Sequence, residues 1–468
     1  RRFKFLIFLF LFSAVLKGQT YTVGMSGGDF STLYEAFDYI NSGGANGDIV
    51  FQIIESTDEI YGTAILNESG SNGGLCDYTS VTIYPTAASC VISGSVDGPL
   101  IELSGADNVT FDGRVDQAGA ADMGITNTST GSSASTIKFS ESAQFNIIQY
   151  CFIQGASSST SGGVLFFATS TAGTGNDNNT VEYSYLTADA AGRPRNMIYS
   201  AGTASRENSD NTINNNFFYD FLNKGAASTG ISLNANTTTW NITDNNFYES
   251  ASFVPTGSGT YYIININNTS GNGFVITGNY IGGSDVACGG SAWDKTNASN
   301  NIFYGMYLNV GTSTATSIQN NTIKNFTWAN SGLAGWYGIN IVAGSVNIGT
   351  TTGNNIGDDA TTGSITFTGG SNNANFYGIA VAGSGTVDCR NNIIGSVTTA
   401  SSVSLAAHIT GILSTNTGTI TISNNTIGSE TVANSLNASS VSGTTGVQLV
   451  YGINNTGAGT LTISNNTI

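Results

Sequence analysis

The chain has 468 residues, of which only 9% are charged, and its 13 basic and 30 acidic residues give a formal net charge of −17. Nucleic acids and anionic membranes bind through basic patches, so this balance argues against both as partners. The chain has 60 glycines and four prolines, and its hydrophobic content of 40% is too high for a disordered chain. The composition therefore predicts a folded protein rich in turns and β-structure.

Residues 1–18 are typical of a secretory signal peptide. A basic start is followed by a short apolar run, residues 5–12, and by small residues up to Gly18. Cleavage there removes four basic residues and no acidic one, so the mature charge becomes 9 − 30 = −21. We therefore expect a protein that is secreted or held at the outer cell surface, with no membrane span after cleavage.

Residues 22–40, TVGMSGGDFSTLYEAFDYI, predict a short amphipathic helix, and Thr32 with Glu35 fits a capping box at its start. Its apolar positions share one helical face: Phe30, Leu33, Phe37 and Ile40. Further on, Cys76 and Cys90 flank a strand-like segment, YTSVTIYPT, and could be joined by a disulfide.

Acidic side chains gather between residues 107 and 122, with Arg114 among them. Calcium prefers oxygen ligands, so Asp112 and Asp116 are candidate ligands for Ca²⁺, the one cofactor that the sequence suggests. Salt bridges within a loop are the alternative interpretation of the same cluster.

One phrase recurs along residues 106–468. It reads ISNNTI at 422–427 and 463–468, IQNNTI at 318–323, and ITDNNFY at 242–248. Aligned on Asn425, its copies lie about 35 residues apart on average, a period typical of stacked supersecondary units. Apolar and polar residues alternate around an Asn pair, which predicts a strand, a turn and a second strand. A short strand beginning with Tyr-Gly precedes several copies, so each repeat supplies two or three strands and a loop.

Stacked repeats place one Asn of each copy at the same turn, where side-chain amides can bond to one another along the axis. The predicted ladder consists of Asn216, Asn246, Asn279, Asn321, Asn392, Asn425 and Asn466.

The period and the strand pattern exclude a helical solenoid and leave a β-propeller as the alternative. At this point the chain resembles right-handed parallel β-helix proteins, the pectin-lyase-like superfamily, of a secreted bacterial type common in Bacteroidota. The segments DIVFQII, SVTIYP and LIELSGADNVTFDG resemble the first coils of such proteins. The resemblance implies an all-β, right-handed parallel β-helix of about ten or more coils, with the helix of residues 22–40 capping its N-terminal end.

This resemblance divides the chain into a signal peptide (1–18), an N-terminal cap with the first coils (19–105) and β-helix repeats (106–468). Because the last copy of the phrase ends at Ile468, we expect the natural protein to continue beyond this residue. We expect the mature protein to be a monomer.

Two motifs resemble catalytic signatures of enzymes with this fold. GDD at 357–359 resembles the Gly-Asp-Asp of polygalacturonases, but the only histidine, His408, lies 49 residues beyond Asp359. CFIQG (151–155) and GRPR (192–195) resemble pectin methylesterase motifs without the aspartates that those enzymes need. The sequence therefore assigns no catalytic residue.

Aromatic residues at and near the Tyr-Gly strands are the candidate binding residues, because exposed rings can stack on sugar rings. They are Tyr304, Tyr307, Trp328, Trp336, Tyr337 and Tyr377. Packing in or beside the core is the alternative role for these rings. We expect a non-enzymatic adhesin, scaffold or glycan-binding protein whose partner is an extracellular polysaccharide or a cell-surface glycan of a host. The alternative is a polysaccharide lyase or glycoside hydrolase.

Overall fold

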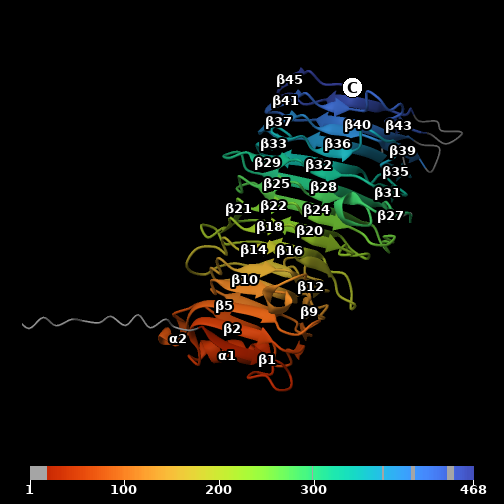
Figure 1. The fold of residues 1–468 in the computed structure, drawn as a ribbon. Helices are drawn as coiled ribbons and strands as arrows, with labels where there is room; N and C mark the ends of the chain where they lie inside the picture. The colour runs from red at the N-terminus through yellow and green to blue at the C-terminus, as the bar shows by residue number, and fades with distance from the viewer. Residues whose placement is uncertain (1–17, 298, 371–373, 402–405, 440–446) are drawn as a thin grey trace, which may run out of the picture.

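The computed structural model describes residues 18–297, 299–370, 374–401, 406–439 and 447–468. Over these residues the chain winds into a column of stacked coils, with three long parallel sheets running along the column (Figure 1). The predicted fold class, an all-β parallel β-helix with a short N-terminal helix, is confirmed. Apart from Gly18, the predicted signal peptide lies outside the described residues.

Sheet A has 14 strands, and each strand pairs in parallel with its counterpart in the next coil. Its strands are β1 (Gln19–Val23), β2 (Asn46–Ile53), β5 (Asp77–Pro85), β8 (Val109–Asp112), β11 (Ile147–Gln149), β14 (Thr180–Glu182), β18 (Thr212–Asn214), β22 (Asn241–Thr243), β25 (Val275–Thr277), β29 (Thr316–Gln319), β33 (Val346–Ile348), β37 (Thr386–Arg390), β41 (Thr419–Ser423) and β45 (Thr460–Ser464).

Sheets B and C have 12 strands each, and the chain passes from A to B to C in every coil. The strands of sheet B are β3 (Thr57–Asp58), β6 (Val91–Gly94), β9 (Met123–Asn127), β12 (Cys151–Gly155), β15 (Tyr185–Ala188), β19 (Phe217–Tyr219), β23 (Asn246–Tyr248), β26 (Tyr280–Ile281), β30 (Thr322–Ile323), β34 (Asn355–Gly357), β38 (Ile393–Gly395) and β42 (Thr426–Ile427). Those of sheet C are β4 (Ala64–Asn67), β7 (Pro99–Ser104), β10 (Ser135–Ser140), β13 (Leu165–Phe167), β16 (Asn196–Ser200), β20 (Ser228–Leu233), β24 (Gly259–Asn268), β28 (Asn301–Val310), β32 (Trp336–Ala343), β36 (Ala374–Val381), β40 (Ala407–Ser414) and β44 (Val450–Asn455).

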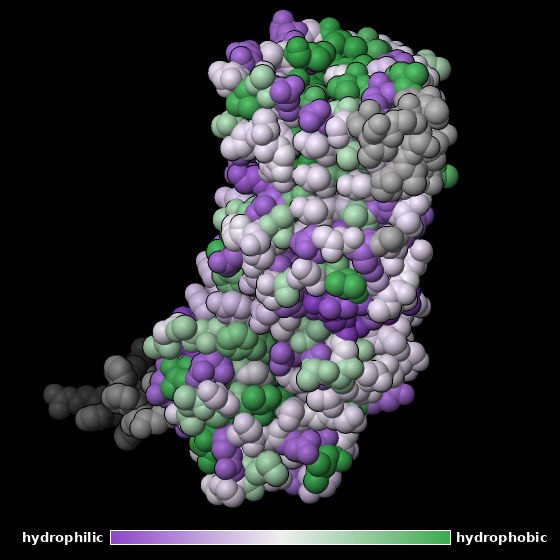
Figure 2. All heavy atoms as spheres, turned by 90° about the vertical axis from the view of Figure 1, so that its right-hand side faces the viewer, coloured by the Kyte–Doolittle hydropathy of each residue, from purple (hydrophilic) through white to green (hydrophobic). Residues whose placement is uncertain are grey.

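The later coils carry an additional five-stranded sheet, sheet D, between sheets B and C. Its strands are β27 (Trp293–Lys295), β31 (Phe326–Ala329), β35 (Ile365–Gly369), β39 (Val397–Ser401) and β43 (Leu436–Ala438). The remaining elements are the pair β17 (Asn208–Ser209) and β21 (Thr237–Thr238), the helices α1 (Leu33–Asn41) and α2 (Ser71–Gly74), and the 3-10 turns η1 (Val115–Gln117) and η2 (Val286–Cys288). The side of the column on which sheet D lies is mostly pale or purple, with only scattered apolar residues (Figure 2).

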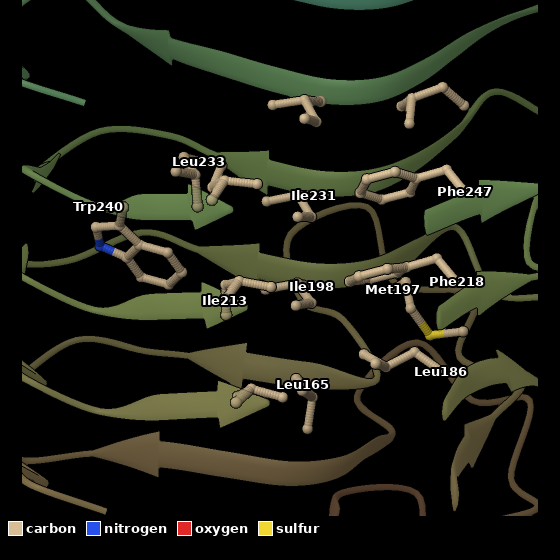
Figure 3. Close-up of a cluster of buried hydrophobic side chains, with 14 of the residues drawn as sticks. Leu165, Leu186, Met197, Ile198, Ile213, Phe218, Ile231, Leu233, Trp240 and Phe247 are labelled. Atoms are coloured by element: carbon tan, nitrogen blue, oxygen red, sulfur yellow. The ribbon is translucent and has the colours of Figure 1, made fainter. Parts of the chain in front are cut away.

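The interior is built from rows of equivalent apolar side chains, one per coil (Figure 3). Ile198 pairs in register with Ile231, and the rings of Phe218 and Phe247 stack with centroids 4.5 Å apart. All four side chains are 1% exposed or less. Each coil therefore buries its apolar face only against its neighbours, as expected for a solenoid.

Helix α1 covers the first coils at the N-terminal end of the column (Figure 1). Half of the predicted capping box is present, because the Thr32 hydroxyl accepts a hydrogen bond from the Glu35 amide, whereas the Glu35 carboxylate accepts from the amide of Ser31, one residue before the N-cap. The buried carboxylate of Glu59 accepts two more from the amides of Leu33 and Tyr34, each at 2.9 Å, and so satisfies the helix N-terminus. Among the described residues, no helix has the length and apolar character needed to cross a bilayer.

The turn between sheets A and B carries the asparagine ladder. Each ladder Asn before the last donates from Nδ2 to Oδ1 of the ladder Asn in the next coil, at 2.9–3.0 Å. The same Oδ1 also accepts the backbone amide of the donating Asn. The members are Asn216, Asn245, Asn279, Asn321, Asn354, Asn392, Asn425 and Asn466. The residue before the ladder Asn usually has a left-handed backbone, as at Asn320 and Asn424, so the two asparagines of the repeated phrase have different roles.

The prediction of Asn246 is wrong by one residue, and Asn354 was missed. Asn245 is fully buried in the ladder, whereas Asn246 begins β23 and points outward, where it accepts a hydrogen bond from the Ala287 amide. The predicted disulfide is also wrong, since Cys76 and Cys90 are both free and buried.

Lys295 in sheet D has a fully buried side chain without a carboxylate partner among the described residues. Its Nζ donates to the backbone oxygens of Asn297, Ser299 and Ala329 and to Oδ1 of Asn330, at 3.0 Å for the last. Burial lowers the pKa of Lys295 to about 8. The ammonium group therefore links the backbone oxygens of Asn297 and Ser299 to the end of β31 and to the buried side chain of Asn330.

Replacing Lys295 with methionine is expected to destabilise the protein by about 2–4 kcal/mol, because several buried oxygens lose their donor. Native Lys295 releases its proton near pH 8, whereas an unfolded lysine releases it near pH ~10.4. The unfolded state holds more protons between these values, so Lys295 makes wild-type stability rise with pH there. Urea unfolding at pH 7 to 10 tests both effects, with Lys324→Met, at a partly exposed ion pair, as the control. Equal losses in the two variants would contradict the prediction.

Candidate functional site

Four tyrosines form a column on the outer face of sheet C. Tyr262, Tyr304, Tyr337 and Tyr377 occupy the same register position in β24, β28, β32 and β36. Successive ring centroids are 5.1, 4.7 and 4.8 Å apart, and successive ring planes differ by 8°, 24° and 20°. Tyr307 lies edge-on beside the column, 5.3 Å from Tyr262 and 5.2 Å from Tyr304. We call the four stacked residues the tyrosine column.

The stacking decides which parts of the column a ligand can reach. The two inner rings, Tyr304 and Tyr337, have a neighbouring ring over each face and present only their edges and hydroxyls. Burial is the main cause of a raised pKa in both, and it raises that of Tyr337 to about 12, so the hydroxyls remain protonated donors and acceptors at neutral pH. The inner rings therefore offer hydrogen bonds and no flat platform for a sugar.

The N-terminal end of the column is different. Thr229 occupies the register position of Tyr262 in the preceding coil. The ring of Tyr262 contacts Tyr304 and Tyr307 of the next coil. On its other side Tyr262 borders a hollow of about 230 Å³. We call this the Tyr262 hollow; its further lining includes Arg195, Asn196, Tyr199, Thr229, Asn234 and Asn265. No described carboxylate forms an ion pair with Arg195, so an aromatic face, a cation and amides converge on one space.

Two of the predicted binding residues are in the core. Trp328 and Trp336 are fully buried, with ring centroids 5.0 and 5.1 Å from Phe303. The Trp328 indole nitrogen donates to the backbone oxygen of Asn301. Sheet D explains this burial, because β31 adds an inner face against sheet C, so these tryptophans cannot contact an external glycan.

The predicted calcium ligands do not form a metal site. The carboxylate of Asp112 is bound by Arg114, with an Nη2–Oδ2 distance of 2.6 Å and an Nε–Oδ1 distance of 2.9 Å, and by Gln149. Asp116 is exposed in η1. No group of three or more His, Cys, Asp or Glu side chains within the described ranges is arranged to hold a metal ion.

The GDD segment is also engaged in structural contacts. Asp358 pairs with Lys324 at 3.4 Å and accepts the Ala360 amide at 2.7 Å. The Nδ1 atom of His408 accepts the amide of Leu449, and burial lowers the pKa of this histidine. These contacts give neither the aspartates nor the histidine a catalytic arrangement.

A second set of stacked rings, on the outer face of sheet B, was missed by the sequence analysis. Phe152, Tyr185 and Phe217 stack at 4.7 Å spacing, and Tyr219 stacks on Tyr248 at 5.5 Å. The signal was present, because an aromatic residue directly precedes the inward Ile153, Leu186 and Phe218, and Tyr219 and Tyr248 directly follow the inward Phe218 and Phe247, but these early copies of the phrase are degenerate. Aromatic stacking therefore marks two outer faces of the column.

No protein-family model matches the chain, and no curated protein matches it either. The function must therefore be argued from the geometry.

Proposed function

We propose that this protein is an extracellular, non-enzymatic β-helix scaffold of the pectin-lyase-like type that binds carbohydrate through the outer face of sheet C. The observation that carries this proposal is the Tyr262 hollow. There Tyr262 and Tyr199 border a space that is also lined by Arg195, Asn234 and Asn265. Saccharide recognition needs an aromatic surface for the apolar face of the sugar and nearby polar groups for its hydroxyls.

The rest of the molecule supports a binding role more than a catalytic one. Of the acidic groups that the sequence pointed to, Asp112 and Asp358 are committed to neighbouring side chains or backbone amides, and Asp116 is exposed. The β-helix is held together by ladders of main-chain hydrogen bonds and by rows of buried side chains, which makes it a stiff support for a surface site. The signal peptide expected from residues 1–18 would deliver this surface to the extracellular space.

The proposal is tested by affinity electrophoresis of the protein, without residues 1–18, through gels that contain single polysaccharides. We expect Tyr262→Ala to weaken binding of a retained polymer about five- to tenfold, because the open ring face is lost. Tyr337→Ala is the matched control, since both faces of that ring are covered by other tyrosines, and we expect it to change binding less than about twofold. Circular dichroism would show whether both variants keep the wild-type fold.

Three results would overturn the proposal. The first is equal loss of binding in the two variants, and the second is no retention by any polymer. The third is release of reducing ends or unsaturated products from a bound polymer, which would favour a hydrolase or lyase.

A further inference from the structure

A groove lies at the corner between sheets B and C, in coils adjacent to the Tyr262 hollow. It has a volume of about 610 Å³ and is bordered by the segments that connect β15 to β16 and β19 to β20. We call it the corner groove; its polar lining consists of Thr187, Asp189, Arg193, Asp220, Asn223 and Lys224. None of these residues was used in the proposed function.

We propose that the corner groove is a second carbohydrate subsite and that it takes a neutral sugar residue. This inference rests on the proposed function, because it assumes that the protein binds glycans, but it concerns different residues on a different sheet.

An aromatic stack ends beside the groove, at Tyr219, directly before the lining residue Asp220 in the chain. At the register position of Tyr219, the preceding coil has Thr187 and the next coil has Tyr248. The rings of Tyr219 and Tyr248 stack with an interplanar angle of 12°. One face of the Tyr219 ring is therefore covered by Tyr248, and the other is directed toward Thr187, which lines the groove. In both places an aromatic stack ends next to a coil that has a threonine at the same register position.

The charges around the groove favour a neutral ligand. Two acids, Asp189 and Asp220, face two bases, Arg193 and Lys224, so neither a polyanion nor a polycation meets a complementary field. The lining still offers hydrogen-bonding capacity. Asp189 uses one oxygen for the Ala191 amide at 3.0 Å, and Lys224 has no ion-pair partner among the described residues. Carboxylate and ammonium groups with unused capacity suit the hydroxyls of a sugar.

Hydrogen bonds to a later coil hold two charged side chains of the groove, Asp220 and Arg193, in place. The Asp220 carboxylate accepts from the amide of Ser250 at 3.0 Å and from its hydroxyl at 2.5 Å. Arg193 is fixed behind the groove by the buried carboxylate of Glu249, at 2.6 and 2.8 Å. Both connecting segments also reach the Tyr262 hollow, through Arg195 and Ala227, so one glycan could contact both spaces.

The experiment measures retention of the protein by neutral polymers (a β-glucan, a galactomannan and a xylan) and by two anionic ones (a polyuronate and dextran sulfate). We expect retention by at least one neutral polymer, weakened about tenfold by Lys224→Met, which removes a charged hydrogen-bond donor. The matched control is Lys324→Met, a lysine in a distant coil, which is expected to bind as the wild type does. Tyr262→Ala reports separately on the Tyr262 hollow, and thermal melting shows that each variant is folded.

The outcomes separate the two proposals. Loss of neutral-polymer binding in Lys224→Met with normal binding in Lys324→Met supports the corner groove. Neutral-polymer binding that depends on Tyr262 but not on Lys224 overturns the groove and leaves the proposed function standing. Retention by the anionic polymers alone also overturns the groove, and retention by none of the five overturns both.

Discussion

Asn245→Ala is expected to lower the free energy of unfolding by about 3–5 kcal/mol, because several buried groups lose their partners at once. The side chain of Asn245 accepts from the amide and from Nδ2 of Asn216, both at 3.0 Å, and donates to the Ile213 oxygen at 2.8 Å and to Asn279 at 3.0 Å. Alanine makes none of these bonds, and the site is too enclosed for bulk water to replace them.

Asn246→Ala is the matched control, since it changes the same residue type one position away. Asn246 is only partly buried, and the hydrogen bond that its side chain accepts from the Ala287 amide, at 2.7 Å, lies in an exposed setting. We expect a loss of less than about 1 kcal/mol. Urea unfolding measures the two losses.

Hydrogen exchange at a single backbone amide compares the same two variants locally. The Asn216 amide should lose protection in Asn245→Ala and keep it in Asn246→Ala, because that amide donates to Asn245 Oδ1. Equal stability losses, or a larger loss in Asn246→Ala, would contradict the ladder assignment.

The same pair of residues shows what the sequence could predict. The period of about 35 residues and the strand–turn–strand pattern are local properties, and both led to the correct fold. The choice between adjacent asparagines depends on which one faces inward, and a repeated phrase alone does not decide it. A better rule counts back from sheet B: the ladder residue precedes one outward residue and then a buried one, as in Asn425, Thr426 and Ile427. This rule would have identified both Asn245 and Asn354.

Sheet D could not be predicted in this way. Because it was not predicted, Trp328 and Trp336 were named as candidate binding residues although they are buried. Its strands lie in the Ser-, Thr- and Gly-rich stretches that vary in length between repeats, so no fixed spacing marks them. Trp293 and Phe326 stack there at 5.4 Å and face sheet C, which encloses Trp328 and Trp336. Tyr304, Tyr337 and Tyr377 share one strand position as predicted, but Tyr307 lies beside them and Tyr262 was missed. The mutual stacking of the rings is a tertiary property that the sequence does not reveal.

Above pH 8, Arg193→Met is expected to destabilise the protein by about 3–5 kcal/mol, because the carboxyl group of Glu249, ionised there in the wild type, loses its buried counter-charge. The Glu249 side chain is fully buried, and Arg193 Nη1 donates to both of its oxygens, at 2.6 and 2.8 Å. The guanidinium also donates to the Leu222 oxygen at 3.2 Å and lies 5.8 Å from the ring of Phe253. As a control, Arg390→Met removes a surface ion pair with Asp388 and is expected to leave the unfolding midpoint unchanged.

The loss in Arg193→Met should also depend on pH, in a direction fixed by the pKa of Glu249. Burial raises this pKa to about 8, although Arg193 opposes the shift. The native state thus holds a proton that the unfolded state loses near pH ~4.3, so Glu249 makes wild-type stability fall with rising pH until about pH 8. Without Arg193 the native pKa rises further, so the variant continues to lose stability above pH 8, by up to about 1.4 kcal/mol per pH unit, and the difference between the proteins widens there.

Urea unfolding between pH 6 and 10 tests this expectation, and Arg193→Met/Glu249→Gln supplies the internal control. The double variant has no buried carboxyl group to ionise, so its stability should exceed that of Arg193→Met at pH 9, and its difference from the wild type should not widen between pH 8 and 10. A loss in Arg193→Met that stays constant with pH, or a double variant no more stable than the single one, would show that Arg193 acts through packing on Phe253 and Leu222. If the pair behaves as expected, Glu249 holds Arg193 by charge, and with it the wall of the corner groove, over the pH range in which the native carboxyl group is ionised.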